Sequence, residues 1–177
     1  MNEKTKATGA PPPSLDRDAL QQFIDRHRID AAILNLNEHT ATVADAARAL
    51  EVETDQIIKS LVFRHNDDAL LVIASGLARV DRKKLAAFLG VGRKKVKFAN
   101  PEEVLRITGY VVGSMPPFGH RTRLRTLIDT EVTGLGTVFG GGGSLNTMMR
   151  LTPDELLRVT GAEVVSVCED SPEISVE

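Results

Sequence analysis

Residues 60–74 of the chain, SLVFRHNDDALLVIA, decide the fold because they predict two strands joined by a turn. Residues 60–64 and 69–74 are apolar runs of strand length, and the polar residues 65–68 between them have the composition of a turn. Two such runs so close together predict an antiparallel hairpin. The segments on either side of the hairpin predict what surrounds it.

Helices are predicted on the N-terminal side of the hairpin. Residues 15–29 carry apolar side chains at helical spacing. Thr42 has the chemistry of an N-cap for an alanine-rich helix that runs to Leu50. Residues 55–59 predict a further short helix that leads into the hairpin.

Three more helices are predicted after the hairpin, and each is followed by a glycine, which suits the left-handed conformation of a helix end. They begin near Asp81, Asn100 and Thr152 and end before Gly90, Gly109 and Gly161. Short strands are predicted between and after these helices, at residues 110–112, 124–129, 137–139, 145–151 and 164–168.

This order of elements predicts a mixed α/β (α+β) fold in one domain, residues 15–170. The strands do not alternate regularly with long helices, which argues against a doubly wound parallel sheet. Residues 1–14 are polar and proline-rich, and we expect a disordered leader there. Residues 171–177 are expected to be a frayed tail.

The composition limits the kinds of partner that the protein can have. Of 177 residues, 42% are hydrophobic and the formal net charge is −2, so the bulk charge does not indicate a nucleic-acid partner. Tryptophan is absent and there is one tyrosine, which argues against a reader of single-stranded bases by stacking. Basic clusters at 82–84, 93–97 and 121–125 could hold one end of an RNA or could be solvated surface.

The sequence lacks the residues that several kinds of catalytic and binding site require. Cys168 is the only cysteine, so an intrachain disulfide is excluded and a reducing compartment, the cytoplasm, is expected. The four histidines have no short ligand spacing, and we expect no metal and no cofactor. The chain has no Gly-x-Ser-x-Gly elbow, and no Gly-Lys-Ser/Thr follows its glycine tract at 140–143. Neither a secretory signal nor a membrane-spanning run is predicted.

The loop at residues 113–120, GSMPPFGH, is the most unusual stretch. Prolines fix its path, and glycines near both ends allow dihedral angles that other residues rarely adopt. Such a loop can direct successive backbone N–H groups at one point, which is how enzymes hold an oxyanion. A rigid surface turn explains the same composition, and the residues alone slightly favour it.

Taken in order along the chain, these motifs resemble the YbaK/EbsC family, whose domain is found inserted in, or beside, bacterial prolyl-tRNA synthetases. The resemblance covers about residues 20–168 and is specific as an ordered set. Its pieces are 42–47 (TVADAA), 57–63 (IIKSLVF), 74–76 (ASG), 79–81 (RVD), 108–110 (TGY), 113–120 (GSMPPFGH), 140–143 (GGGG) and 151–156 (LTPDEL).

The resemblance implies the family's fold, a mixed and mostly antiparallel sheet or partial barrel surrounded by short helices. The resemblance also implies the family's activity, which is hydrolysis of the ester bond of a mischarged tRNA. It places the catalytic groups at Lys59, Gly113, Ser114, Met115, Pro116 and His120. It places substrate-binding groups at Ser60, Val62, Ser75, Gly76, Pro117, Phe118, Gly141 and Gly142.

The implied roles are specific. Lys59 would grip the phosphates of the terminal adenosine, and the backbone of the loop would face the substrate carbonyl. His120 would donate to a ribose oxygen or cap the loop, and both remain open. Water would attack with help from the ribose hydroxyl. Val62, Met115, Phe118 and Met148 are candidates for the pocket wall.

The expected partners are the acceptor end of an aminoacyl-tRNA and, as a second partner, an aminoacyl-tRNA synthetase, with the protein a monomer or a homodimer. The removed residue would be small, such as Ala, Ser, Thr or Cys. Three alternatives stay open at this point. They are a non-catalytic adaptor that binds tRNA or a synthetase, a small-molecule or nucleotide binder that uses the glycine tract, and a hydrolase of another ester or amide.

Overall fold

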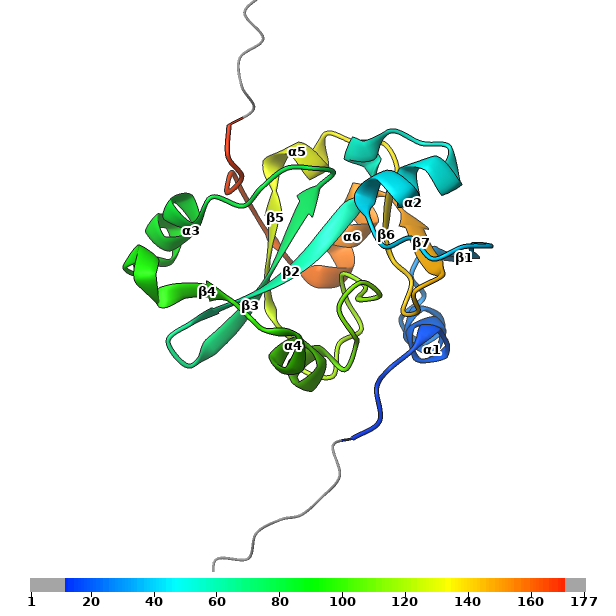
Figure 1. Cartoon of the computed structure of the whole chain (residues 1–177), viewed down its shortest axis with the longest axis horizontal. Coiled ribbons are helices and arrows are strands. Elements are labelled where there is room, and N and C mark those ends of the chain that lie inside the picture. Colours follow the sequence, from blue (N-terminus) through cyan, green and yellow to red (C-terminus); the bar gives the residue numbers. More distant parts are fainter. Residues whose placement is uncertain (1–11, 171–177) are drawn as a thin grey trace, which may run out of the picture.

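The computed structural model describes residues 12–170 (Figure 1), so most of the expected leader and all of the expected tail lie outside the described residues. Its elements are α1 Arg17–His27, β1 Ala32–Asn35, α2 Val43–Leu50, η1 Thr54–Gln56, β2 Ile58–His65, β3 Asp68–Ser75, α3 Arg82–Leu89, η2 Arg93–Lys95, β4 Val96–Phe98, α4 Pro101–Thr108, β5 Arg125–Asp129, α5 Thr130–Thr133, β6 Val138–Gly141, β7 Thr147–Leu151, α6 Pro153–Thr160 and β8 Glu163–Val165.

The predicted hairpin is confirmed and lies at the centre of the molecule. β2 and β3 pair antiparallel along their whole length, from Ile58 opposite Ser75 to His65 opposite Asp68. Asn66 in the turn has a φ of 52°, a left-handed conformation that asparagine tolerates better than most residues. The hairpin belongs to a five-stranded sheet of order β4-β2-β3-β5-β8, in which β5 and β8 run parallel to their neighbours.

A second, antiparallel sheet of order β1-β7-β6 lies beside the first. A parallel bridge between Ile57 and Phe139 joins the two sheets next to the start of β2. In Figure 1 the second sheet and α2 lie on one side of the hairpin, and α3 and β4 lie on the other. The described strands form no closed barrel, and the mixed α/β fold with mostly antiparallel pairs is the one expected.

The central sheet is buried on both faces. Side chains alternate along a strand, so Ile58, Ser60 and Val62 face one side, and Lys59 faces the other side of the sheet. On the first side, the core includes Leu71, Ile73, Ile128 and Leu156. On the second side, Phe63 and Val72 pack with Leu85 of α3.

Local capping chemistry sets the helix ends, as the sequence predicts. The side chains of Thr42, Asp81, Asn100 and Thr152 each accept a backbone N–H at a helix start. Gly90, Gly109 and Gly161 end three of these helices with a positive φ. Such caps contribute about 1 kcal/mol each, and they depend on neighbours in sequence, which is why they can be predicted.

Two local predictions are wrong. The short helix expected at 55–59 is a 3₁₀ turn over 54–56, and β2 begins at Ile58, so Lys59 lies in a strand. The strand expected at 110–112 is a bend. There the N–H of Arg121 donates to the carbonyl of Thr108 at 2.8 Å, a distant partner that local periodicity does not reveal. β1, β4 and α5 were not predicted, since each has only three or four residues.

Candidate functional site

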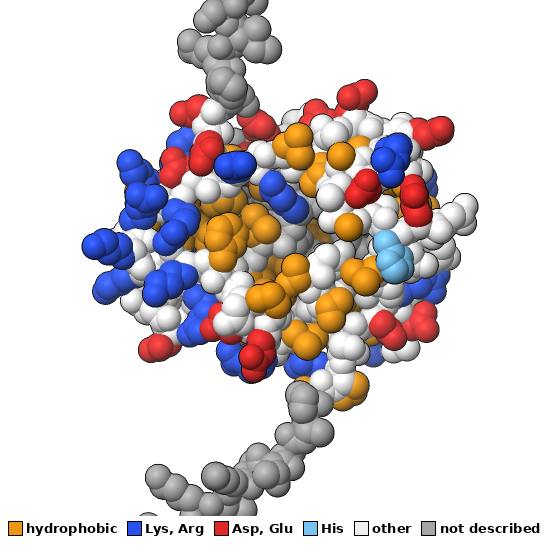
Figure 2. Space-filling model, viewed as in Figure 1, with side chains coloured by type: hydrophobic (Ala, Val, Ile, Leu, Met, Phe, Trp, Pro, Cys, Tyr) orange, Lys and Arg blue, Asp and Glu red, His pale blue; other side chains and the backbone are white. Residues whose placement is uncertain are grey.

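A cavity of about 310 Å³, here called the β2 cavity, opens beside the first half of β2. One wall is Ile57 with the first half of β2, and another is the start of α2 with the segment 40–42 before it. The loop at 113–120 faces them through Gly113 and Met115. Figure 2 shows a hollow in the middle of this face, with hydrophobic side chains around its rim.

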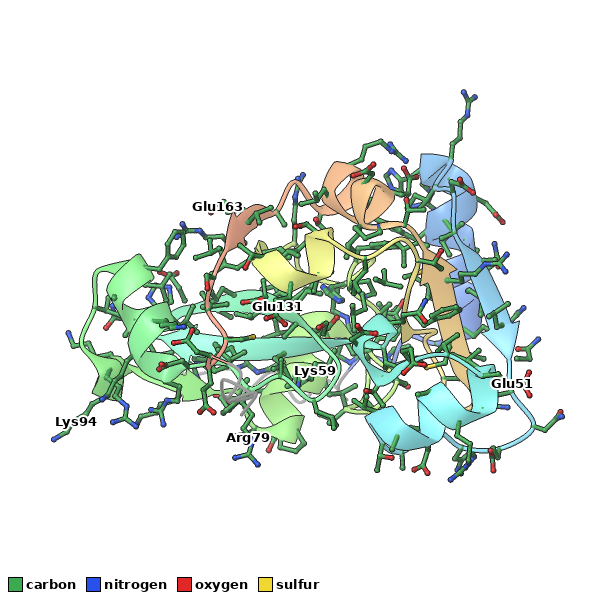
Figure 3. The ribbon with its side chains drawn as sticks, turned by 90° about the horizontal axis from the view of Figure 1, so that it is seen from above. Glu51, Lys59, Arg79, Lys94, Glu131 and Glu163 are labelled. Carbon is green, nitrogen blue, oxygen red and sulfur yellow. The ribbon has the colours of Figure 1, made fainter. Side chains whose placement is uncertain are left out.

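Lys59 lines the β2 cavity, and its ammonium group is held at one side. The Nζ donates to the carbonyl oxygen of Ala78, in the segment that follows β3. Burial lowers the pKa of Lys59, and the nearby Arg79 lowers it further, whereas Cys168 acts in the opposite direction. Figure 3 shows Lys59 within the molecule and Arg79 projecting from the surface nearby. An ammonium has three protons, so two remain for a ligand.

Cys168 does not have the properties of a nucleophile. Its pKa is raised to about 12 by burial and by the carboxylate of Asp129, so the thiol is neutral at physiological pH. The same carboxylate accepts the backbone N–H of Val167 and of Cys168, at 2.9 and 3.0 Å. The cysteine therefore belongs to the packing of the sheet edge.

The first half of the loop borders the β2 cavity and contains backbone N–H groups without an acceptor in the described part of the chain. Gly113 has a φ of 94°, which a residue with a side chain rarely adopts. Ser114 is buried, and its Oγ donates to the carbonyl of Val111 at 3.0 Å, which tightens the turn. Within residues 12–170, the N–H groups of Gly113 and Met115 have no hydrogen-bond acceptor. Both residues line the cavity.

The glycine tract allows the loop to sit close to β6. A Cβ on Gly141 would collide with the carbonyl of Met115, and a Cβ on Gly142 would lie 2.7 Å from the carbonyl carbon of Thr147. The N–H of Gly143 donates to the carbonyl of Ser114 at 2.9 Å. The tract therefore acts by close backbone contact, and only Gly141 of the tract lines the β2 cavity.

The second half of the loop faces a different cavity. His120, Pro117 and Phe118 line a space of about 340 Å³, here called the α1 cavity, between α1, the loop and α6. The Nε2 of His120 lies 2.7 Å from the carbonyl oxygen of Pro116, and because a carbonyl can only accept, this nitrogen carries the proton. Burial lowers the pKa of His120, which favours the neutral ring. This geometry favours loop capping over contact with a ribose oxygen.

Ser75 and Gly76 support β2 from the end of β3. Ser75 is buried opposite Ile58, and the N–H of Gly76 donates to the carbonyl of Ile57 at 2.6 Å. A Cβ on Gly76 would lie 2.8 Å from the carbonyl oxygen of Thr54. These contacts fix the start of β2, where Lys59 lies, and neither residue lines the cavity.

The structure thus divides the expected site residues into two groups. Those that line the β2 cavity are Lys59, Ser60, Val62, Gly113, Met115 and Gly141, together with the expected wall residue Met148. Those that do not are Ser75, Gly76, Ser114, Pro116, Pro117, Phe118, His120 and Gly142.

Some lining residues were missed. They include Thr40, Phe98 and Val112. Thr40 and Val112 have no chemical signal in the sequence. Phe98 has one, since an aromatic residue directly follows a run of lysines, but its exposure depends on β4 being an edge strand.

Two features are absent from residues 12–170. No group of three or more His, Cys, Asp or Glu side chains is placed to hold a metal ion. No helix in this part of the chain has the length and apolar character needed to cross a membrane.

Comparison with known proteins gave consistent matches. A family model described as the aminoacyl-tRNA editing domain matches residues 37–159. The uncharacterized protein YwhH of Bacillus subtilis is 36% identical over 133 residues, which cover 74% of this chain and 83% of YwhH. A proline–tRNA ligase of Thermosipho melanesiensis is 35% identical over 78 residues, which cover 44% of this chain and 14% of the ligase.

A solved structure shows the same fold. The crystal structure of a candidate trans-editing enzyme for prolyl tRNA synthetase has a TM-score of 0.80 and 34% identity, with 87% of this chain and 97% of that chain covered.

Proposed function

The chain belongs to the aminoacyl-tRNA editing domain family, and from that premise we propose that it is a deacylase that hydrolyses the ester of a mischarged tRNA. One observation carries the proposal. Gly113 and Met115, whose N–H groups have no acceptor within residues 12–170, line the same cavity as Lys59. A carbonyl that develops negative charge needs donors of this kind, and a tRNA end carries phosphates that suit an ammonium group.

The proposed reaction is attack of water on the ester carbonyl. The carbonyl oxygen becomes an oxyanion held by the N–H groups of Gly113 and Met115. Collapse of the tetrahedral intermediate breaks the bond to the ribose oxygen, which takes up the proton lost by water, and the free amino acid leaves. The neighbouring ribose hydroxyl helps to orient the water. Because an aminoacyl ester is already labile, orientation and oxyanion stabilisation account for the acceleration in this scheme.

Lys59 would hold the RNA end. Its Nζ already donates one proton to the Ala78 carbonyl, which fixes the direction of the other two. Burial strengthens an ionic contact with a phosphate because the local dielectric constant is low. Lys59 therefore positions the ester against the loop in this proposal.

The β2 cavity has mostly apolar walls, which suit an uncharged amino-acid side chain. Ala41, Ala46 and Ala99 line it together with Met115 and Met148. A synthetase discriminates poorly between small side chains, since one methylene is worth about 1–3 kcal/mol, and a second hydrolytic site corrects the error. We propose Ala, Ser, Thr or Cys as the removed residue.

The similarity to part of a proline–tRNA ligase supports tRNA for proline, or a related tRNA, as the carrier. We propose that the protein acts in the cytoplasm, where tRNA is charged, with a synthetase as a second partner.

The test is a deacylation assay on tRNA for proline charged with each of these amino acids and with proline. We expect hydrolysis of one or more mischarged species and little hydrolysis of the prolyl ester. Lys59→Ala and Lys59→Met should lower kcat/KM roughly 10- to 100-fold, the effect of losing one charge-assisted contact. Arg26→Ala, which removes one exposed positive charge from α1, is the matched control.

Full activity of both Lys59 variants would contradict the role given to Lys59. Tight binding of tRNA without turnover of any ester would favour the non-catalytic adaptor instead.

A further inference from the structure

A basic surface adjoins the β2 cavity. It consists of Arg64, Lys94, Lys95 and Lys97 around a hollow of about 390 Å³. Figure 2 shows the Lys and Arg side chains gathered over the side of the molecule where α3 and β4 lie in Figure 1. The chain as a whole has a formal net charge of −2, so this concentration of positive charge is local.

The charges of the basic surface are mostly not neutralised by the protein. Glu103 is the one acidic residue that lines the hollow, and it already pairs with Arg64 and accepts the N–H of Asn100 at 3.0 Å. Lys94, Lys95 and Lys97 are exposed, and none forms an ion pair within residues 12–170. Three lysine charges therefore face solvent side by side.

The fold brings these positive charges close to one another, and their mutual repulsion lowers its stability. Lys97 on β4 lies directly opposite Arg64 on β2, and like charges opposite each other destabilise an antiparallel pair. The turn η2 adds Lys94 and Lys95 immediately before β4. A polyanion bound across these residues would relieve the repulsion, since it neutralises several charges at once.

Phe98 connects the basic surface with the β2 cavity, because it lines both. Its side chain is exposed, with a relative accessibility of 56%, yet its ring packs on the buried ring of Phe63 at a centroid distance of 4.3 Å. The ring is therefore held in place with one part open to solvent. Nucleobases stack on exposed aromatic rings, and the gain is about 1–3 kcal/mol per base.

We propose that the basic surface binds the phosphates of the tRNA acceptor stem, and that Phe98 stacks on a base of the single-stranded end where it enters the β2 cavity. This inference rests on the proposed function. Lysines act here as point charges on the phosphate backbone, so the contact is independent of base sequence. The proposal explains how a protein of slightly negative net charge holds an RNA.

The first experiment compares two substrates. One is the mischarged tRNA, and the other is the same amino acid esterified to a CCA trinucleotide, which lacks the stem. The double variant Lys94→Ala/Lys95→Ala should raise KM for the tRNA roughly tenfold and leave kcat unchanged. It should leave the trinucleotide ester unaffected. The slope of log(kcat/KM) against log[salt] should fall by about 1 per lysine.

The matched control is Arg26→Ala/Arg150→Ala, which removes the same charge from exposed positions on α1 and β7. These elements lie at the opposite side of the molecule from β4 (Figure 1). An unchanged KM and salt slope for the lysine variant, or equal losses with both double variants, would overturn the proposal. Equal losses with both substrates would also overturn it, because the trinucleotide does not reach the basic surface.

Binding of uncharged tRNA, followed by fluorescence anisotropy, separates this inference from the proposed function. It does not require hydrolysis, so it tests the basic surface even if the protein cleaves no ester. Weaker binding by the lysine variant alone would support the basic surface, and equal binding by wild type and variant would contradict it.

Phe98 is tested by Phe98→Leu and Phe98→Tyr. Leucine keeps apolar packing on Phe63 but lacks a ring, and tyrosine keeps the ring. We expect Phe98→Leu to raise KM for both substrates several-fold and Phe98→Tyr to retain the wild-type value. Equal KM values for the two variants would contradict stacking.

Discussion

The two cavities on either side of the loop at 113–120 are similar in size and different in chemistry. The β2 cavity, about 310 Å³, is lined mainly by aliphatic side chains, with Lys59 and with Gly113 and Met115, whose N–H groups have no acceptor within residues 12–170. The α1 cavity, about 340 Å³, is lined by rings and cationic side chains, among them Phe23, His27, Arg123 and Arg158. One loop therefore has two faces, and only the β2 face places unpaired backbone N–H groups in a cavity that Lys59 also lines.

The face of the loop toward α1 is held in place by packing and hydrogen bonds with N-terminal residues. Phe23 stacks on Phe118 at a centroid distance of 5.9 Å, and the N–H of Leu15 donates to the carbonyl of Gly109 at 2.6 Å. Arg121 donates to the carbonyl of Pro13 at 2.7 Å. These N-terminal residues precede the segment 37–159 that matches the family model. These N-terminal contacts therefore support the loop on the side away from the β2 cavity.

The largest effect is expected where β6 approaches the loop. Gly141→Ala places a methyl group against the Met115 carbonyl, so the loop must shift and the N–H of Met115 leaves its position. We expect kcat for the mischarged ester to fall roughly 100-fold, as when an oxyanion donor is lost. The assay is run below the melting temperature of the variant.

Gly136→Ala is the control for this variant, since a Cβ at Gly136 meets no atom within 4 Å. If Gly141→Ala kept the wild-type kcat, the distinction between the two faces of the loop would lose its main support.

A smaller effect is expected from loss of the contact between Phe23 and the loop. Phe23→Ala removes a half-buried ring from Phe118 and Gly119. We expect a loss of about 2 kcal/mol in the free energy of unfolding, below the range for a fully buried phenylalanine. We also expect a fall in kcat without a change in KM, because the loop loses support and no substrate contact is removed. Phe23→Leu should restore most of both. A change in KM alone would instead indicate that substrate reaches the α1 cavity.

The smallest effect concerns pH. Burial lowers the pKa of His120 in the folded state below its ordinary value of about 6.5. The unfolded chain then binds more protons than the folded chain below that pH, so this contribution to stability is complete above about pH 6.5 and declines as the pH falls. We expect the melting temperature of wild type to drop more between pH 7 and pH 5 than that of His120→Gln. Parallel curves for the two proteins would show that His120 is not held neutral.

Local interactions account for what the sequence predicted correctly. The hairpin around Asn66 and the caps at Thr42, Asn100 and Thr152 depend on residues near in sequence, and all were predicted. The assignment of Lys59 to a helix end failed because the pairing of β2 with β3, a longer-range feature, decides its conformation.

The division of the loop between two cavities could not be read from the sequence either. It depends on where α1 packs and on the contact of Gly141 with Met115, both made by residues far apart in the chain. The composition of the loop indicated backbone donors but not which residues would present them. For the same reason, nothing local showed that His120 and Phe118 would turn away from Lys59.

Binding of the ester in the β2 cavity is tested most directly by an amide-resolved NMR titration. The ligand is a non-hydrolysable analogue, an adenosine that carries the amino acid through a 3′-amide. We expect the amide resonances of Gly113, Met115 and Ser60 to shift and those of Phe23 and Thr160 to stay unchanged. Shifts centred on the α1 cavity, with Gly113 and Met115 unaffected, would contradict binding in the β2 cavity.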